Sequence, residues 1–200
     1  RNLSAHYRLE NDIDLENQLW IPIGRSKIFN GSLDGNGYAI KNLKVHGSVN
    51  SNGGLINEIN GTVKNLIIEN AIVTGSYTNA GSLTGKMSGA LENCVIKGTI
   101  EVKGSESAGG LIGQLTGTLI GSRAEGSVKV ESLGSNAGGL AGIVTGELKD
   151  SRGEGKITVE SAGNNTGGLA GSVMTTENKV VVENNSIMAE VTVKGLDNVG

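Results

Sequence analysis

Few side chains in this sequence are spaced as a catalytic or metal-binding site would require. The most suggestive short run is Asp34-Gly35-Asn36-Gly37, which carries oxygen-bearing side chains that could bind calcium. A calcium loop needs more carboxylates at alternating positions and a closing Glu, and neither follows this run. Asp-Gly and Asn-Gly strongly favour tight turns, so we interpret the run as a turn.

The histidines and the cysteine form no catalytic pattern. His6 and His46 are the only histidines, and the chain contains no H-E-x-x-H motif, so we expect two surface histidines and no peptidase centre. Cys94 is the single cysteine, and its position in the repeat described below points it inward as a buried, unreactive thiol. We therefore expect no catalytic residue, no metal site and no cofactor in this chain.

Two glutamates could form an acid–base pair on neighbouring units of a repeat. Glu125 and Glu154 occupy equivalent positions, and Arg123 and Arg152 stand two residues before them. Residues two apart on a strand share a face, so each Arg lies beside a Glu. We therefore expect a neutralised surface patch rather than the carboxylate pair of a glycosidase. These four residues form a candidate contact surface.

The composition limits the fold that could position these residues. The chain has 33 Gly but 1 Pro, and 36% of its residues are hydrophobic although only 2% are aromatic. Many short strands joined by tight turns fit this composition. The 17 basic and 20 acidic residues are interspersed and give a net charge of −3, so a nucleic-acid partner is not expected. The apolar runs are only a few residues long, which argues against a membrane span.

A repeat of 28 or 29 residues determines the expected architecture. Each copy centres on a motif such as A-G-G-L-I-G, and a unit of this length must stack on its neighbours to bury apolar side chains. We predict an all-β parallel β-helix, or β-solenoid, with 28–29 residues per coil and three short strands in each. Parallel crossovers are right-handed in most proteins, so we expect a right-handed coil. The anchor leucines are Leu55, Leu83, Leu111, Leu140 and Leu169.

Equivalent positions in successive coils should form columns of one chemical character. Inward columns are predicted to include Ile72 and Thr74 in the first regular copy, by alignment with Ile100 and Val102 in the next. Outward columns place opposite charges next to each other, as in Lys103 with Glu131, Glu160 with Lys194 and Glu101 with Lys129. One corner column should need a left-handed backbone; its members are Asn70, Gly98, Gly126, Gly155 and Ala189.

Residues 1–50 break the period and are expected to form one or two irregular coils, whereas residues 51–200 form the regular ones. Residues 7–15 alternate in polarity and predict a strand, and residues 20–24 predict an edge segment because Pro22 cannot donate a hydrogen bond. Trp20 and Phe29 are expected to cover the end of the stack. The predicted core residues here are Phe29, Leu33, Ile40 and Leu43.

The last full repeat carries an insertion at residues 175–179. We expect it to form a loop at one corner, and Thr175, Thr176 and Lys179 join the candidate contact surface. The sequence opens inside a motif and stops inside a repeat, so we also expect a longer parent protein.

These motifs together resemble the GLUG-repeat family. The matching segments are D-I-D-L (12–15), W-I-P-I-G (20–24) and the run from Phe29 to Leu43, followed by the G-G-L-x-G repeats. Asn57 and Ser82 depart from the repeat, because each replaces a motif glycine. The family occurs in large secreted or wall-anchored bacterial proteins, including adhesin-like proteins and the N-terminal region of immunoglobulin A-specific metallopeptidases. It has no shared catalytic residues, so the resemblance implies fold and extracellular location only.

Three functions remain open from the sequence. The first is a non-catalytic module that adheres to a host protein or glycan, or that spaces and presents other domains of the parent chain. The second is a substrate-capture region of a surface metallopeptidase whose active site lies elsewhere. The third is a glycan-active β-helix enzyme. Fold-level analogy cannot choose among them.

Overall fold

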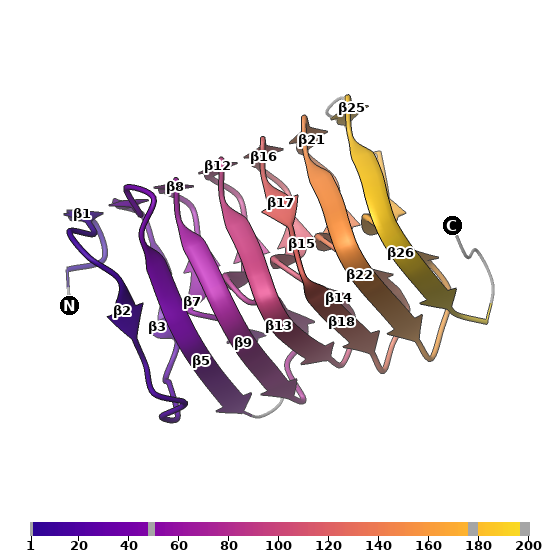
Figure 1. The fold of residues 1–200 in the computed structure, drawn as a ribbon, viewed down its shortest axis with the longest axis horizontal. Helices are drawn as coiled ribbons and strands as arrows, with labels where there is room; N and C mark the ends of the chain where they lie inside the picture. Colours follow the sequence, from indigo (N-terminus) through magenta and orange to yellow (C-terminus); the bar gives the residue numbers. More distant parts are fainter. Residues whose placement is uncertain (1, 48–50, 176–179, 197–200) are drawn as a thin grey trace.

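The fold is a stack of parallel coils built from strands and turns. The computed structural model describes residues 2–47, 51–175 and 180–196, and these ranges contain no helix, so none of them holds a helix that could cross a membrane. A regular coil contributes to four parallel sheets, which form the walls of the stack (Figure 1). The chain passes through these sheets, here called A, B, D and C, in that order. The β-solenoid predicted from the repeat is confirmed.

The strands of each sheet come from successive coils. Sheet A contains β1 (His6–Arg8), β4 (Ser32–Asp34), β8 (Thr62–Lys64), β12 (Ala90–Glu92), β16 (Thr118–Ile120), β21 (Glu147–Lys149) and β25 (Val181–Glu183). Sheet B contains β2 (Ile13–Asp14), β5 (Ala39–Gly47), β9 (Ile67–Gly75), β13 (Val95–Gly104), β17 (Arg123–Ala124), β18 (Ser127–Ser132), β22 (Arg152–Ser161) and β26 (Ser186–Lys194). Sheet C contains β3 (Ile23–Phe29), β7 (Ile56–Ile59), β11 (Thr84–Met87), β15 (Ile112–Leu115), β20 (Ala141–Val144) and β24 (Ala170–Val173). Sheet D contains β6 (Asn52–Gly53), β10 (Asn79–Ala80), β14 (Ser107–Gly109), β19 (Asn136–Gly138) and β23 (Thr166–Gly167).

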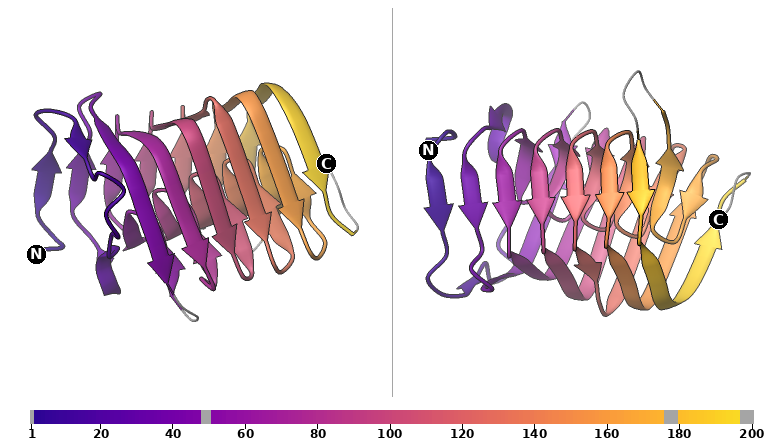
Figure 2. Two further views of the ribbon diagram at one scale, coloured as in Figure 1. Left: turned by 60° about the horizontal axis from the view of Figure 1, so that its bottom comes forward. Right: turned by 90° about the horizontal axis from the view of Figure 1, so that it is seen from above.

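The coils wind to the right, as expected. In Figure 1 the strands of sheet B face the reader and run downward while the chain advances from left to right. The view from above in Figure 2 shows the strands of sheet A running toward that same face. A chain that moves toward the reader over the top and then down the front, while advancing to the right, follows a right-handed path.

The core consists of inward columns of aliphatic side chains. The amide of Leu83 donates to the carbonyl of Leu111 at 3.1 Å, and the amide of Leu111 donates to that of Leu140 at 3.0 Å. All three leucines are fully buried. The predicted leucine column is therefore confirmed, and backbone hydrogen bonds hold its members in register.

The number of strands in a coil and the inward column at Ile72 were predicted wrongly. A regular coil has four strands rather than three, because sheet D consists of strands of two or three residues that are too short and Gly-rich to show alternation. Ile72 and Thr74 lie on the outward face, and Ala71 and Val73 fill the inward column instead. The reason is a bulge in β13, which carries one extra residue between Lys97 and Ile100.

The predicted left-handed corner is confirmed at four positions. Asn70, Gly98, Gly126 and Gly155 have φ angles of 55°, 75°, 91° and 88°. Asn70 also binds the bulged backbone of the next coil, because its side-chain Oδ1 accepts a hydrogen bond from the amide of Thr99 at 3.0 Å. Ala189 was wrongly included, because it lies inside the continuous strand β26 and has no positive φ.

The first coils differ from the expectation in one respect. Residues 7–15 form two strands rather than one, because the chain turns a corner between β1 in sheet A and β2 in sheet B. The core residues predicted for this region are confirmed, and each is at most 7% exposed; they are Phe29, Leu33, Ile40 and Leu43.

The insertion in the last repeat is also confirmed. Val144 pairs with Val173, and Glu147 pairs with Val181, so two residues join the strands in one coil and seven join them in the next. Thr175 is exposed at the start of this connection. Thr176 and Lys179 lie outside the described residues.

Candidate functional site

The outer face of sheet B carries four residues of the candidate contact surface, whereas Thr175 lies apart from them on the connection from sheet C to sheet A. Register places Arg123 beside Arg152 on adjacent coils, in the column predicted from the sequence. Both arginines are exposed, and Glu125 and Glu154 are half-buried next to them. Arg123 Nε lies 3.2 Å from Glu125 Oε1, which neutralises that carboxylate as expected. No ion pair joins Arg152 to Glu154 in the part of the chain that the structure describes.

Charge pairs extend along the same face from coil to coil. Lys97 Nζ lies 3.4 Å from Glu69 Oε2 on the preceding coil. Ion pairs also confirm two of the charge ladders that were predicted from the sequence. Lys103 Nζ approaches Glu131 Oε1 at 2.7 Å, and Lys194 Nζ approaches Glu160 Oε1 at 2.8 Å. The hydrogen bond from Lys194 lowers the pKa of Glu160. Exposed pairs of this kind contribute about 0.2–1 kcal/mol each, so they set the charge pattern of the face more than its stability.

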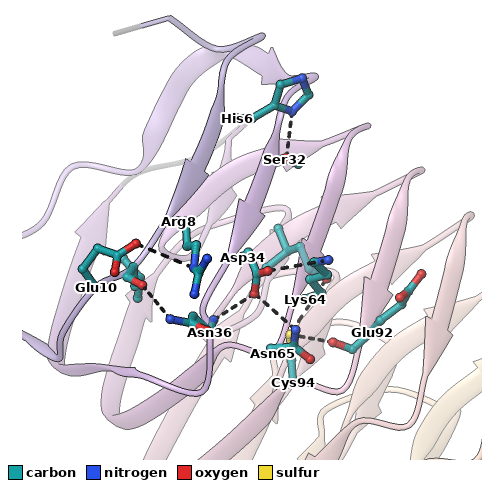
Figure 3. Close-up of polar contacts among 12 residues, drawn as sticks. His6, Arg8, Glu10, Ser32, Asp34, Asn36, Lys64, Asn65, Glu92 and Cys94 are labelled. Atoms are coloured by element: carbon teal, nitrogen blue, oxygen red, sulfur yellow. Dashed lines mark hydrogen bonds and ion pairs between the residues drawn. The ribbon is translucent and has the colours of Figure 1, made fainter.

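The Asp34 run is a turn whose carboxylate is already occupied. Asp34 Oδ1 accepts hydrogen bonds from the amide of Asn36 at 2.9 Å and from Asn65 Nδ2 at 3.2 Å, and its Oδ2 lies 3.6 Å from Lys64 Nζ (Figure 3). The backbone hydrogen bond from Asn36, with the help of Asn65 and Lys64, lowers the pKa of Asp34. The amide of Tyr38 closes the turn on the carbonyl of Gly35 at 2.8 Å. The predicted turn is confirmed, and its oxygens face hydrogen-bond donors rather than an open cation site.

The two histidines lie on the surface, as expected. His6 Nδ1 lies 2.8 Å from Ser32 Oγ on the next coil (Figure 3), and His46 Nδ1 lies 3.3 Å from Thr74 Oγ1. Neither contacts the other. Within the described ranges, no three His, Cys, Asp or Glu side chains lie close enough together to hold a metal ion.

Cys94 is buried, as predicted. It is 2% exposed, and burial raises the pKa of its thiol to about 12. The inward column around it is polar and ordered, because the amide of Cys94 donates to Ser122 Oγ and the amide of Ser122 donates to Ser151 Oγ, both at 3.2 Å. A thiol with this pKa and no access to solvent is not a nucleophile at neutral pH.

The N-terminal end of the stack has several hollows that the sequence did not predict, and two of them reach the coils beside Phe29 or Tyr77. One, of about 340 Å³, is apolar and lies among the first coils beside Phe29, so Trp20 and Phe29 do not close the end completely. The other, of about 290 Å³, is here called the Trp20 hollow; its lining includes Trp20, Arg25, His46, Asn52, Asn57 and Tyr77. In the sequence, Asn57 stands out only because it replaces a glycine of the repeat motif. This replacement was the one sequence feature that could have indicated an irregular site here.

The Trp20 hollow exists because, in the described residues, sheet D has no strand on the N-terminal side of β6. Sheet D begins at β6, whereas the other three sheets continue into the first coils. There the chain crosses differently, with the amide of Trp20 bonded to the carbonyl of Lys44 at 2.8 Å and Trp20 Nε1 bonded to the carbonyl of Leu55 at 3.0 Å. Space that a sheet D strand fills in regular coils is therefore left open.

Comparison with known proteins finds a structural relative. No protein-family model matches the chain, and no curated protein matches its sequence. The fold is similar to the crystal structure of a "putative immunoglobulin A1 protease" from Bacteroides ovatus, with a TM-score of 0.70 and 18% sequence identity. The similarity covers 100% of this chain and 79% of the Bacteroides ovatus chain. At this identity the likeness establishes a shared β-solenoid fold.

Proposed function

We propose that this chain is a non-catalytic β-solenoid module of the GLUG-repeat type in a secreted or cell-surface bacterial protein. It acts as a rod that adheres to a host protein or glycan, or that presents other domains of its parent. The GLUG-like motifs support the family and the extracellular location. The likeness to the Bacteroides ovatus protein supports a bacterial, secreted context.

The observation that carries this proposal is the outer face of sheet B. It is the broadest wall, because its longest strands, β13 and β22, have 10 residues each, and several of its charges are paired along the coils. A wall of this kind offers wide, shallow contact to a protein or a polysaccharide rather than an enclosed reaction site. Its balanced charge does not suit nucleic acid.

Substrate capture within a surface peptidase is the second candidate. The name of the Bacteroides ovatus protein favours it, since that protein is described as an immunoglobulin A1 protease. In that case the chain would bind the immunoglobulin through Arg123, Arg152 and the Thr175 connection, and cleavage would occur on another domain.

A glycan-active enzyme is the third candidate and the least supported. Its acid–base pair would be Glu125 and Glu154, but Arg123 already neutralises Glu125 at 3.2 Å. A carboxylate that is ion-paired on an outward strand face, rather than enclosed in a pocket, is poorly placed for acid–base catalysis.

The test separates binding from turnover. The chain is incubated with a panel of acidic polysaccharides and with immunoglobulin A, and cleavage and binding are measured separately. We expect no cleavage product. Binding that weakens in Arg152→Ala but not in the control His6→Ala would support adhesion or capture through sheet B. Turnover that disappears in Glu125→Gln or Glu154→Gln would overturn the non-catalytic proposal.

A further inference from the structure

The Trp20 hollow contains two buried polar side chains whose hydrogen-bonding groups are incompletely used. Asn57 is 6% exposed, and its Oδ1 accepts only a long hydrogen bond of 3.4 Å from the amide of Asn52. Tyr77 is 3% exposed. Among the described residues, nothing accepts a hydrogen bond from Asn57 Nδ2 or pairs with the Tyr77 hydroxyl. No fully enclosed side-chain nitrogen or oxygen in the described part of the chain lacks a partner, so these two groups reach solvent through the hollow that they line and are available to a ligand there.

Asn57 is specific to this coil. The equivalent residue in the next coil is Gly85, where a side chain would collide with the carbonyl oxygen of Asn79 and come within 2.5 Å of the Cβ of Asn52. Of these two atoms, the Cβ of Asn52 belongs to the sheet D strand of the preceding coil, and at Gly113 in the following coil an added Cβ would likewise lie 2.7 Å from the amide nitrogen of Ala80 in the preceding coil. No sheet D strand precedes the coil of Asn57 in the described residues, which lets an amide side chain occupy the position and face the hollow.

The position of the Tyr77 ring depends on two glycines of the preceding coil. Side chains at Gly47 and Gly53 would collide with its hydroxyl and its ring, so the ring lies directly on the backbone at these two glycines. Burial raises the pKa of the Tyr77 phenol, which keeps the hydroxyl protonated and able to donate. The hollow thus has a fixed phenol beside the amide of Asn57.

The rest of the lining adds an aromatic face and positive charge. Trp20 is half-buried, and its ring is fixed by the hydrogen bond from Nε1 to the carbonyl of Leu55. Arg25 supplies a positive charge and His46 an imidazole, and the described residues of the lining include no Asp or Glu. Arg25 is held at the rim by a tight turn, since its amide donates to the carbonyl of Pro22 at 3.1 Å.

From these features we propose that the Trp20 hollow binds a single sugar ring that carries a carboxylate. The C–H face of the ring packs on Trp20, because an indole offers a rigid apolar surface. Asn57 and Tyr77 bind ring hydroxyls, and Arg25 pairs with the carboxylate. The volume of about 290 Å³ is near the lower limit of about 300 Å³ for ligand pockets, which restricts the occupant to one ring. The lining of this site includes none of the candidate contact residues Arg123, Glu125, Arg152 and Glu154, so it stands or falls independently of the proposed function.

Trp20 makes the test direct, because it is the single tryptophan of the chain. Intrinsic fluorescence is followed while the chain is titrated with the methyl glycosides of glucuronate, galacturonate and N-acetylneuraminate, and with methyl glucoside and methyl galactoside as neutral partners. Calorimetry confirms each isotherm. We expect saturation with at least one acidic glycoside and binding at least about fivefold weaker for its neutral partner.

Two variants test the assigned groups with little risk to the fold. Asn57→Gly installs the residue that the regular coils have, and Tyr77→Phe removes only the hydroxyl. Each should weaken binding about fivefold to tenfold, whereas the control Tyr38→Phe, outside the hollow, should bind like the parent. Circular dichroism verifies that each variant is folded. Absence of saturation with every glycoside, or unchanged binding in both variants, would overturn the site. Equal affinity for an acidic glycoside and its neutral partner would overturn the role of the carboxylate.

Discussion

Replacing Leu111 by Ala tests the column that defines the fold. Leu111 is fully buried between Leu83 and Leu140, and backbone hydrogen bonds of 3.1 and 3.0 Å fix the three coils in register. The loss of transfer free energy and the resulting cavity cost about 2.7–5 kcal/mol in a Leu→Ala change. We expect the upper half of this range, because coils held by backbone hydrogen bonds cannot collapse into the space.

The assay is thermal unfolding followed by circular dichroism, together with amide hydrogen exchange. A loss of about 4 kcal/mol lowers the melting temperature by roughly 8–16 °C for a chain of this size. Exchange should accelerate most in the coils on either side of Leu111, because a solenoid is stabilised by contacts between neighbouring coils. The matched control is Leu133→Ala, at a side chain that is 50% exposed.

The two leucine variants give a clear refutation. If Leu111→Ala melts within a few degrees of the parent, as we expect of Leu133→Ala, Leu111 does not lie in a close-packed inward column. The assignment of every column in the repeat would then be wrong, since all share one register. Leu111→Asp adds an unpaired buried charge and should be more destabilising than Leu111→Ala by several kcal/mol.

Three further predictions follow from the same structure. A thiol reagent should modify Cys94 slowly in the folded chain and rapidly in denaturant, and equal rates would place the thiol at the surface. Gly139→Ala should destabilise the chain by about 1–3 kcal/mol in denaturant titration, because the new Cβ would overlap the carbonyl oxygen of Gly168; an unchanged midpoint would contradict this close approach. The pKa of Asp34 is lowered in the folded state from a value of 3.8, so its contribution to stability is present above about pH 4 and is lost as the pH falls through the folded pKa. Asp34→Asn should therefore lower the free energy of unfolding at pH 7 and leave it unchanged at a pH below the folded pKa of Asp34. A loss of stability that is the same at every pH would contradict a stabilising role for the ionised carboxylate.

Much of the fold could be predicted from the repeat because a stacked coil imposes one chemical character on each column. The spacing of the anchor leucines was sufficient to predict a parallel solenoid, and the left-handed corner at Asn70 and Gly98 was visible as a column of residues that tolerate positive φ. The inward direction of Cys94 followed from the same alignment. The charge ladders on sheet B followed too, because residues at one column position lie about 4.8 Å apart on successive coils.

Alignment failed where neighbouring coils differ in length or path. Ile72 was placed inward because a bulge at Lys97–Ile100 adds one residue to the next strand, and one residue reverses the face of every side chain beyond it. The short strands of sheet D left no alternation to detect. The break between β1 and β2 was equally hidden, since polarity continues to alternate around the corner.

The sequence by itself determined the architecture, the register of most columns and the lack of a recognisable catalytic motif, since each is a property of a single repeat unit. Only the tertiary structure decided which polar groups face an open hollow, since that depends on the coils before and after each of them. Asn57 is an irregularity in the sequence, and it becomes a candidate ligand contact because no strand of sheet D lies beneath it. Tyr77 is one tyrosine among three, and it faces the same hollow because two glycines of the preceding coil leave room for its ring. A binding site formed where the repeat is interrupted cannot be seen in the repeat itself.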